Sequence, residues 1–158
     1  MHKILITGGL GFIGSNIIYN LLKKNKNTEV HVVDNLSNSN IKTLYHLRKF
    51  SKNFVHFYQA NINEKSVLDR IFQANKIDAV IHMAALKSVS ESESKKGLYY
   101  WNNIRGSKTL LKSMVENNVN NLIFSSSATV YGIPRILPIK EIHRTKPINF
   151  YGFTKLEI

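Results

Sequence analysis

Tyr151 and Lys155 stand four residues apart in the segment YGFTK, close to the end of this 158-residue chain. That spacing places a phenol and an ammonium group on one face of a helix. A free tyrosine has a pKa near 10, so a tyrosine base at neutral pH needs about 4 kcal/mol of extra stabilisation of its phenolate, which a neighbouring positive charge favours. The pair could therefore move a proton to and from a hydroxyl group. Tyrosine and lysine also occur at this spacing by chance, so the interpretation depends on what accompanies them.

A cluster of hydroxyl side chains precedes the pair, in the segment FSSSATVYG (Phe124–Gly132). The segment follows the last apolar run of the chain, and in doubly wound folds ligands bind beyond the carboxyl ends of the strands. The same residues could equally form a Ser/Thr turn that satisfies only local backbone groups. Both interpretations stay open from the residues alone.

Four glycines follow the first apolar run, in TGGLGFIGS. Gly9, Gly11 and Gly14 match the dinucleotide pattern G-x-G-x-x-G, and Gly8, Gly11 and Gly14 match a variant with wider spacing. Glycine permits a tight turn with positive φ and lets the backbone approach a pyrophosphate, and the helix that opens near Phe12 directs its N–H groups at that anion.

An aspartate, Asp34, ends the second apolar run, twenty residues after Gly14. A carboxylate at this place accepts hydrogen bonds from the adenosine ribose and repels a 2′-phosphate, which favours NAD over NADP. The alternative is a glycine turn of structural importance only, which is less favoured when the strand, the helix and the aspartate accompany the glycines.

The elements that must position these residues alternate between strand and helix. Short apolar runs predict strands, and apolar residues at helical spacing predict the helices between them. The expected strands are Lys3–Thr7, Val30–Asp34, Phe54–Tyr58, Ala79–Ala84 and Asn121–Ser126, and the expected helices are Phe12–Lys24, Ile41–Phe50, Glu64–Ala74 and Gly97–Glu116. The pattern predicts an α/β fold, a Rossmann-like doubly wound parallel sheet of about five strands. We expect residues 1–158 to form one such domain, without a second one.

The charge and the cysteine and histidine content of the chain indicate which kinds of partner and site are not favoured. The formal net charge is +12, yet the basic residues are scattered singly and in pairs, so nucleic acid is not the favoured partner. The chain has no cysteine, which fits the reducing cytoplasm, and we expect the protein there. No run of apolar residues is long enough for a secretory signal or a membrane span. The six histidines show no paired metal-ligand spacing, so we expect no metal site.

In this order, the glycines, the aspartate, the hydroxyl cluster and Tyr-x-x-x-Lys resemble the extended short-chain dehydrogenase/reductase family. The resemblance covers essentially the whole chain. It is greatest to the NAD-dependent branch that epimerises C4 of UDP-glucose and UDP-galactose, and it rests on ITGGLGFIGSN, VVDNLSNS, VIHMAALKSVSES, YYWNNIRGS and LIFSSSATVYG. Related dehydratases carry an acid pair, as in SSTDEVYG, where this chain has Ala128 and Thr129.

The resemblance implies NAD as the cofactor and assigns its contacts. Those at the pyrophosphate are Gly8, Gly11, Phe12, Ile13 and Gly14; those on the adenosine side are Asp34, Asn35, Ser37, Asn38 and Ser39; Asn61 and Ile62 flank the adenine; Met83, Ala84, Ala85 and Lys87 run beside the cofactor; and Asn102, Tyr151 and Lys155 complete the set. The family usually has Asp where this chain has Asn61.

The chemistry implied by the resemblance is a reversible oxidation at the sugar. Tyr151 would take the proton of the 4-hydroxyl while the cofactor accepts hydride, Lys155 would support the tyrosine and hold the nicotinamide ribose, and Ser127 would hydrogen-bond the 4-oxygen. Ser127, Thr129 and Tyr151 would contact the sugar. The implied partners are a UDP-sugar and a second copy of the chain.

Members of this family are much longer than this chain. We therefore expect an N-terminal part that ends before the later strands and the C-terminal substrate domain, with little or no epimerase turnover. Two other interpretations stay open, namely a non-catalytic dinucleotide-binding module and another nucleotide-sugar epimerase of the same family.

Overall fold

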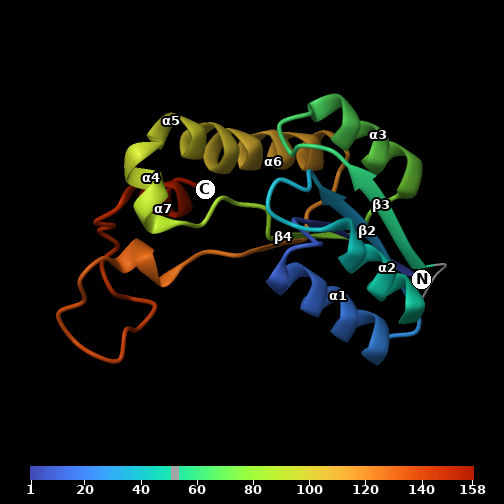
Figure 1. Cartoon of the computed structure of the whole chain (residues 1–158), viewed down its shortest axis with the longest axis horizontal. Helices are drawn as coiled ribbons and strands as arrows, with labels where there is room; N and C mark the ends of the chain where they lie inside the picture. The colour runs from blue at the N-terminus through green and yellow to red at the C-terminus, as the bar shows by residue number, and fades with distance from the viewer. Residues whose placement is uncertain (51–53) are drawn as a thin grey trace. The chain divides into compact units, whose positions relative to one another are not determined.

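The structure is a computed structural model that describes residues 1–50 and 54–158 (Figure 1). It divides into two compact units, and each is described by itself. Unit 1 comprises Met1–Ala84 and Thr109–Ser125, and unit 2 comprises Ala85–Lys108 and Ser126–Ile158. The elements in chain order are β1 (His2–Thr7), α1 (Phe12–Lys24), β2 (Thr28–Asp34), α2 (Ile41–Phe50), β3 (Val55–Gln59), α3 (Lys65–Asn75), β4 (Ala79–His82), α4 (Val89–Ser94), α5 (Lys96–Tyr99), η2 (Tyr100–Arg105), α6 (Gly106–Glu116), β5 (Leu122–Phe124), η3 (Ala128–Tyr131) and α7 (Phe150–Leu156).

Unit 1 is built on a five-stranded sheet in the order β3-β2-β1-β4-β5, and every neighbouring pair is parallel. The chain moves outward from β1 to β3 and then crosses back to β4, so the strand order reverses beside β1. This is the doubly wound Rossmann-like arrangement that the alternation of strands and helices predicted. All strands therefore direct their carboxyl ends to one edge, where ligands bind in such sheets.

Alternate residues of each strand serve two apolar cores. Ile6, Val32 and Ile81 pack with α1 and α2 through Ile18 and Leu44. Their strand neighbours Leu5, Val33 and Val80 face the other way, and the residues of that second core on α3 and α6 are Leu68, Ile71, Phe72, Leu110 and Met114. Figure 1 shows α1 and α2 on one side of the strands and α3 on the other.

Several element boundaries differ from the prediction. Strands β4 and β5 end at His82 and Phe124, earlier than expected, because the chain leaves the sheet there. The expected single helix Gly97–Glu116 contains a π-helical segment, η2, between α5 and α6. The short helix α4 was not predicted, since its sequence VSESES is polar and lacks an apolar stripe.

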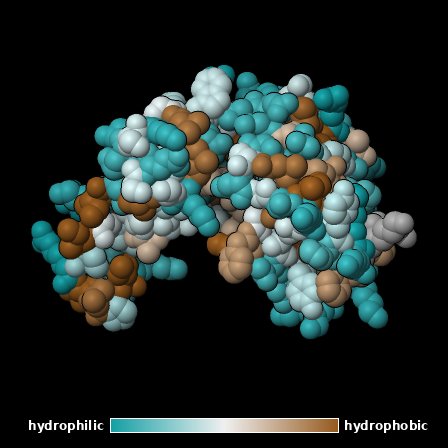
Figure 2. All heavy atoms as spheres, in the orientation of Figure 1, coloured by the Kyte–Doolittle hydropathy of each residue, from teal (hydrophilic) through white to brown (hydrophobic). Residues whose placement is uncertain are grey.

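Unit 2 contains α4, α5, η2, η3, α7 and a long loop between the last two. Between η3 and α7 the structure has turns and bends only. Five of the loop's large apolar side chains are exposed, namely Ile133, Ile136, Leu137, Ile142 and Ile148. Figure 2 shows hydrophobic atoms gathered on this loop.

None of the helices formed by the described residues has the length and apolar character needed to cross a lipid bilayer.

Candidate functional site

The loop between β1 and α1 turns tightly at Gly8. The Gly8 N–H donates to the carbonyl oxygen of Val33 at 2.8 Å, and the Gly11 N–H donates to the carbonyl oxygen of Gly8 at 3.2 Å. Gly8 has a φ of +66°, a conformation that a side chain disfavours. The sequence requirement for glycine here is therefore a backbone requirement.

Close backbone approach explains two of the glycines. A Cβ atom on Gly14 would lie 2.5 Å from the carbonyl oxygen of Gly8, and one on Gly8 would lie 2.7 Å from the backbone nitrogen of Ala84. Within the described residues, no side chain caps the first turn of α1. The N–H groups at this helix end, with the positive end of its dipole, are thus suited to an anion. The loop Gly8–Gly14, called the cradle below, therefore offers close backbone approach beside the uncapped N–H groups of α1, and this arrangement fits a pyrophosphate.

Asp34 lies at the carboxyl end of β2 and is 7% exposed. Its Oδ2 accepts a hydrogen bond from the Leu10 N–H at 3.0 Å, while its Oδ1 accepts from the Leu36 N–H at 3.0 Å and from Ser39 Oγ at 2.7 Å. Asp34 therefore fastens the glycine loop to the β2–α2 loop. The role of Asp34 at the ribose stays a prediction, and its structural bond to Leu10 was not predicted.

Other residues assigned to the adenosine follow β2 and β3. Asn35, Ser37 and Asn38 are exposed in the loop after Asp34, and Asn35 Oδ1 accepts from the Ser37 N–H at 3.0 Å. Asn61 follows β3, and its Oδ1 accepts from the backbone N–H of Asn63 at 3.0 Å and from Asn63 Nδ2 at 3.1 Å. Ile62 beside it is buried in the core that contains Val33.

Met83 and Ala84 continue β4 past its end and are bonded to Thr7. The Met83 N–H donates to the Thr7 carbonyl oxygen at 3.1 Å, and the Ala84 N–H donates to Thr7 Oγ1 at 3.3 Å. Thr7 Oγ1 also lies 2.6 Å from His82 Nδ1. Unit 1 thus brings the glycine loop, Asp34, Met83 and Ala84 to the carboxyl ends of β1, β2 and β4.

In unit 2, the helix α7 carries both Tyr151 and Lys155. Tyr151 is half-buried, whereas Lys155 is 5% exposed. Burial lowers the pKa of Lys155 from 10.5 to about 8. At pH 7 the ammonium form still prevails, so a positive charge is held four residues from the phenol.

Three side chains satisfy the first backbone N–H groups of α7. Glu93 Oε1 accepts from the Phe150 N–H at 2.6 Å, Ser92 Oγ accepts from the Tyr151 N–H at 3.0 Å, and the N-cap Asn149 accepts from the Gly152 N–H at 2.7 Å. Capping of this kind stabilises a short helix. The unpredicted helix α4, which supplies Ser92 and Glu93, therefore positions the Tyr151 backbone.

Asn103 is a positioning residue that the sequence argument missed. It is fully buried in the π-helical segment η2. Its Oδ1 accepts from the Leu86 N–H at 2.9 Å, and its Nδ2 donates to the Leu86 carbonyl oxygen at 2.9 Å and to Thr154 Oγ1 at 3.1 Å. One amide thus fixes the segment around Leu86 and the helix α7 together. In the sequence, only the adjacent asparagines of YYWNNIR could have drawn attention to Asn103. Its place in a π-helical segment is consistent with such a role, because π-helical turns often occur at functional sites.

The hydroxyl cluster lies next to α7 within unit 2. Ser127 caps η3, and its Oγ accepts from the Thr129 N–H at 3.2 Å and from Thr129 Oγ1 at 2.8 Å. A Cβ on Gly152 would lie 2.7 Å from the Thr129 carbonyl oxygen, so the two elements are in close contact. The local turn is therefore present, and it also places Ser127 and Thr129 beside the helix of Tyr151.

The remaining predicted residues also lie in unit 2. Ala85 is half-buried, and Lys87 is exposed ahead of α4. Asn102 is half-buried, and its Nδ2 donates to Asn103 Oδ1 at 3.0 Å.

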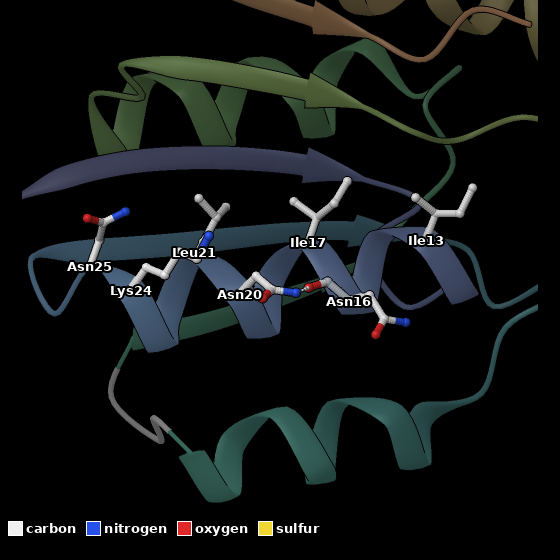
Figure 3. Close-up of a pocket in the computed structure, with 7 residues that line it drawn as sticks. All are labelled: Ile13, Asn16, Ile17, Asn20, Leu21, Lys24 and Asn25. Carbon is white, nitrogen blue, oxygen red and sulfur yellow. Dashed lines mark hydrogen bonds between the residues drawn. The ribbon is translucent and has the colours of Figure 1, made fainter.

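A hollow of about 360 Å³ lies along one flank of α1, away from the residues assigned to the cofactor except Ile13 (Figure 3). The Asn16 and Asn20 side chains fold back onto the helix, donating to the carbonyl oxygens of Phe12 and Asn16 at 2.8 Å each. The hollow thus offers little polar chemistry. Its lining residues are Ile13, Asn16, Ile17, Asn20, Leu21, Lys24 and Asn25.

A doubly wound sheet with a glycine cradle and a strand-end aspartate, in a chain whose helix α7 bears Tyr-x-x-x-Lys, is the arrangement of a Rossmann-like dinucleotide-binding protein. The sequence model of the NAD dependent epimerase/dehydratase family matches residues 4–158, and the chain belongs to that family.

Individual relatives are UDP-glucose 4-epimerases. The enzyme of Yersinia enterocolitica is 47% identical over 157 residues, which are 99% of this chain and 46% of that protein. The crystal structure of the enzyme of Bifidobacterium longum, in complex with NAD⁺ and UDP, is 42% identical with a TM-score of 0.92, and the match covers 98% of this chain and 46% of that one. A third relative is the enzyme of Stenotrophomonas maltophila, whose crystal structure contains NAD and formylated UDP-arabinopyranose. It is 38% identical with a TM-score of 0.93, and the match covers 99% of this chain and 46% of that one. The chain spans about half the length of these relatives.

Proposed function

We propose that these 158 residues are the NAD-binding N-terminal part of a UDP-glucose 4-epimerase. The observation that carries the proposal is the cradle, in which a Cβ on Gly14 would stand 2.5 Å from the Gly8 carbonyl oxygen at an uncapped helix start. The similar structures that contain NAD support it.

Unit 1 would bind the adenine dinucleotide. The α1 N-terminus and the backbone of the glycine loop would hold the pyrophosphate. Asp34 has two oxygens that can each accept two hydrogen bonds, and the protein uses three of these four positions. A ribose hydroxyl could donate to the remaining position. A 2′-phosphate would instead be repelled by the negative charge of a carboxylate that three donors hold in place.

Unit 2 would handle the sugar. When bound, NAD supplies reversible hydride acceptance from a carbinol carbon. Tyr151 would take the proton of the sugar 4-hydroxyl and later return it. The buried Lys155 ammonium would stabilise the phenolate form that accepts this proton. Ser127 would donate a hydrogen bond to the 4-oxygen. The caps on α7 and the Asn103 amide serve this chemistry by fixing the tyrosine backbone.

Because its relatives are about twice as long, we infer that the 158-residue chain alone turns over little or no UDP-sugar. A galactose-pathway substrate, UDP-glucose or UDP-galactose, is the one we propose for the whole enzyme; another nucleotide sugar of the same family is the alternative. A dinucleotide-binding module without catalysis is the second candidate function, favoured by the same cradle.

Titration with NADH and NADPH, followed by nicotinamide fluorescence, tests cofactor binding. The wild-type chain should bind NADH saturably and NADPH at least tenfold more weakly, and Asp34→Asn should weaken NADH binding and reduce that ratio. Asp78→Asn is the matched control, because Asp78 also accepts from a backbone N–H, that of Lys3 at 2.7 Å, but precedes β4. Failure of the wild-type chain to bind NADH would refute the proposal.

Reduction of bound NAD on addition of UDP-galactose, read by absorbance, separates the two candidate functions. An epimerase site should show reduction that Tyr151→Phe abolishes while NADH affinity is retained. Because the 158 residues alone are expected to turn over little UDP-sugar, the assay uses concentrated chain and follows a single oxidation per bound NAD rather than turnover. NADH binding without even this single oxidation would favour the binding module.

A further inference from the structure

A second group of polar residues lies in unit 1, on the sheet face that α3 covers. Glu29 and His31 are two residues apart on β2, so they share a face of the sheet. His56 on β3 is the register partner of His31, which places its side chain beside them. These positions lie toward the amino ends of the strands, whereas the proposed cofactor residues lie at the carboxyl ends.

The ligand atoms of the three side chains converge. Glu29 Oε1 lies 3.0 Å from Nε2 of His31 and 3.0 Å from Nε2 of His56. The three ligand atoms all lie within 4.8 Å of one another. His31 is fully buried, and its Nε2 lies 3.0 Å from the Glu29 carboxylate without forming a well-aligned hydrogen bond within the described residues. A buried nitrogen without such a bond is costly unless something else satisfies it.

Further residues fix the orientation of the His31 ring. Its Nδ1 lies 3.1 Å from the Tyr58 hydroxyl, which accepts a hydrogen bond from Asn75 Nδ2 at 3.3 Å. The rings of His31 and His56 are stacked with centroids 4.8 Å apart. A metal-bound histidine usually has its other ring nitrogen hydrogen-bonded in this way, which selects the tautomer that presents a lone pair.

We propose that Glu29, His31 and His56 bind a divalent cation of the Zn²⁺ type, with one coordination position open to water. Two imidazoles and a carboxylate form a donor set typical of zinc. The carboxylate would bind through Oε1 alone, because Oε2 lies 3.7 Å from the Lys3 ammonium. The ion would tie β3, an edge strand of the sheet, to β2, and so stabilise that edge.

The sequence offered no such signal, because the two histidines are 25 positions apart and only the parallel register of β2 and β3 joins them. The alternative is a polar network without metal, in which Nε2 of His56 donates a hydrogen bond to Glu29. A metal site would bind Zn²⁺, whereas a network without metal would not.

Calorimetric titration of ZnCl₂ into the chelator-treated full chain tests the proposal. The wild type should take up one equivalent, and His56→Asn and Glu29→Gln should each weaken that binding at least tenfold. His46→Asn is the matched control, since His46 is exposed on α2 and should bind zinc as the wild type does. His56 is 44% exposed, so its replacement leaves the core unchanged, and circular dichroism checks the fold; Glu29→Gln carries the same test should His56→Asn fail to fold.

Substitution with Co²⁺ and thermal unfolding provide independent readouts. Bound Co²⁺ should show the intense visible bands of a four-coordinate ion, and Zn²⁺ should raise the melting temperature of the wild type but not that of His56→Asn. The proposal is overturned if the wild type binds no Zn²⁺, or if His56→Asn and Glu29→Gln bind it as the wild type does. NADH titration is separate, so neither result depends on the proposed epimerase function.

Discussion

The side-chain amide of Asn103 donates a hydrogen bond to Thr154 Oγ1 at 3.1 Å, and Thr154 Oγ1 in turn donates to the carbonyl oxygen of Tyr151 at 2.7 Å. A buried amide in η2 is therefore connected to the backbone of the tyrosine through one hydroxyl. Because the same amide also pairs with both backbone groups of Leu86, it is the centre of the polar network of unit 2.

Replacing Asn103 with leucine should destabilise the chain strongly. Leucine has nearly the same shape but leaves the Leu86 N–H and carbonyl groups without partners in a buried place, so the free energy of unfolding should fall by about 2–4 kcal/mol. Urea unfolding followed by circular dichroism measures this. Asn102→Ala, in the neighbouring half-buried position with one hydrogen bond to Asn103, should cost less than about 1 kcal/mol. Equal losses in the two variants would contradict the role given to Asn103.

Ser92→Ala should loosen the start of α7. Ser92 is fully buried, and its Oγ accepts from the Tyr151 N–H and donates to the Val89 carbonyl oxygen at 2.6 Å. Its loss should lower the free energy of unfolding by about 1–2 kcal/mol, as loss of a helix cap does. Hydrogen exchange should show faster exchange of the Tyr151 amide. Ser94→Ala in the same helix is the control, because Ser94 is exposed and its Oγ donates to the Glu91 carbonyl oxygen within α4 itself. This variant should change neither measurement.

The sheet of unit 1 could be predicted from the sequence because its signals are local. Each strand is a short apolar run, and the glycine pattern lies between the first run and an amphipathic helix, so five strands and the cradle followed from residues close together in the chain. The boundaries of β4 and β5 were less certain, since the residues that follow them are still apolar or hydroxylic and leave the sheet without a proline or glycine to mark the end.

The support of α7 could not be predicted, because its contacts join residues far apart in sequence. Ser92 and Tyr151 are 59 residues apart, and Asn103 and Thr154 are 51 apart. No periodicity marks a serine as the cap of a distant helix, and a π-helical turn has no sequence signature comparable to that of an α-helix. For the same reason the approach of His56 to His31 was visible only once the register of β2 and β3 was known.

Gly14→Ala should disrupt the cradle. The new methyl group would lie 2.5 Å from the Gly8 carbonyl oxygen, and backbone on both sides must shift to accept it. We expect a loss of about 1–3 kcal/mol in the free energy of unfolding, and at least a tenfold loss in NADH affinity. Gly97→Ala is the matched control, because among the described residues a Cβ there meets no atom of another segment within 4 Å. Gly97 lies in α5, so alanine should leave NADH affinity unchanged and stabilise the chain by up to about 1 kcal/mol. Unaltered NADH binding by Gly14→Ala would argue against the cradle as the cofactor site.

The burial of Lys155 should make stability depend on alkaline pH. Its pKa falls from 10.5 in the unfolded chain to about 8 in the folded one, because burial disfavours the charged form. Below pH 8 both states carry the proton, and the buried charge costs about 3 kcal/mol of stability. Between pH 8 and 10.5 the unfolded chain binds more protons than the folded one, so stability rises with pH and the cost disappears.

The variant Lys155→Met removes that titration while keeping an apolar stem of similar length. The free energy of unfolding of the wild type, relative to that of Lys155→Met at the same pH, should rise by about 2–3 kcal/mol between pH 7.5 and 10.5. The comparison at each pH cancels the ionisation of other groups, such as Tyr58 and Tyr99, whose pKa values burial raises. Lys108→Met, at an exposed position on α6, should give a curve parallel to that of the wild type. A constant difference between the wild type and Lys155→Met over this range would mean that Lys155 has the same pKa in the folded and unfolded states, and that its ammonium group is not buried as described.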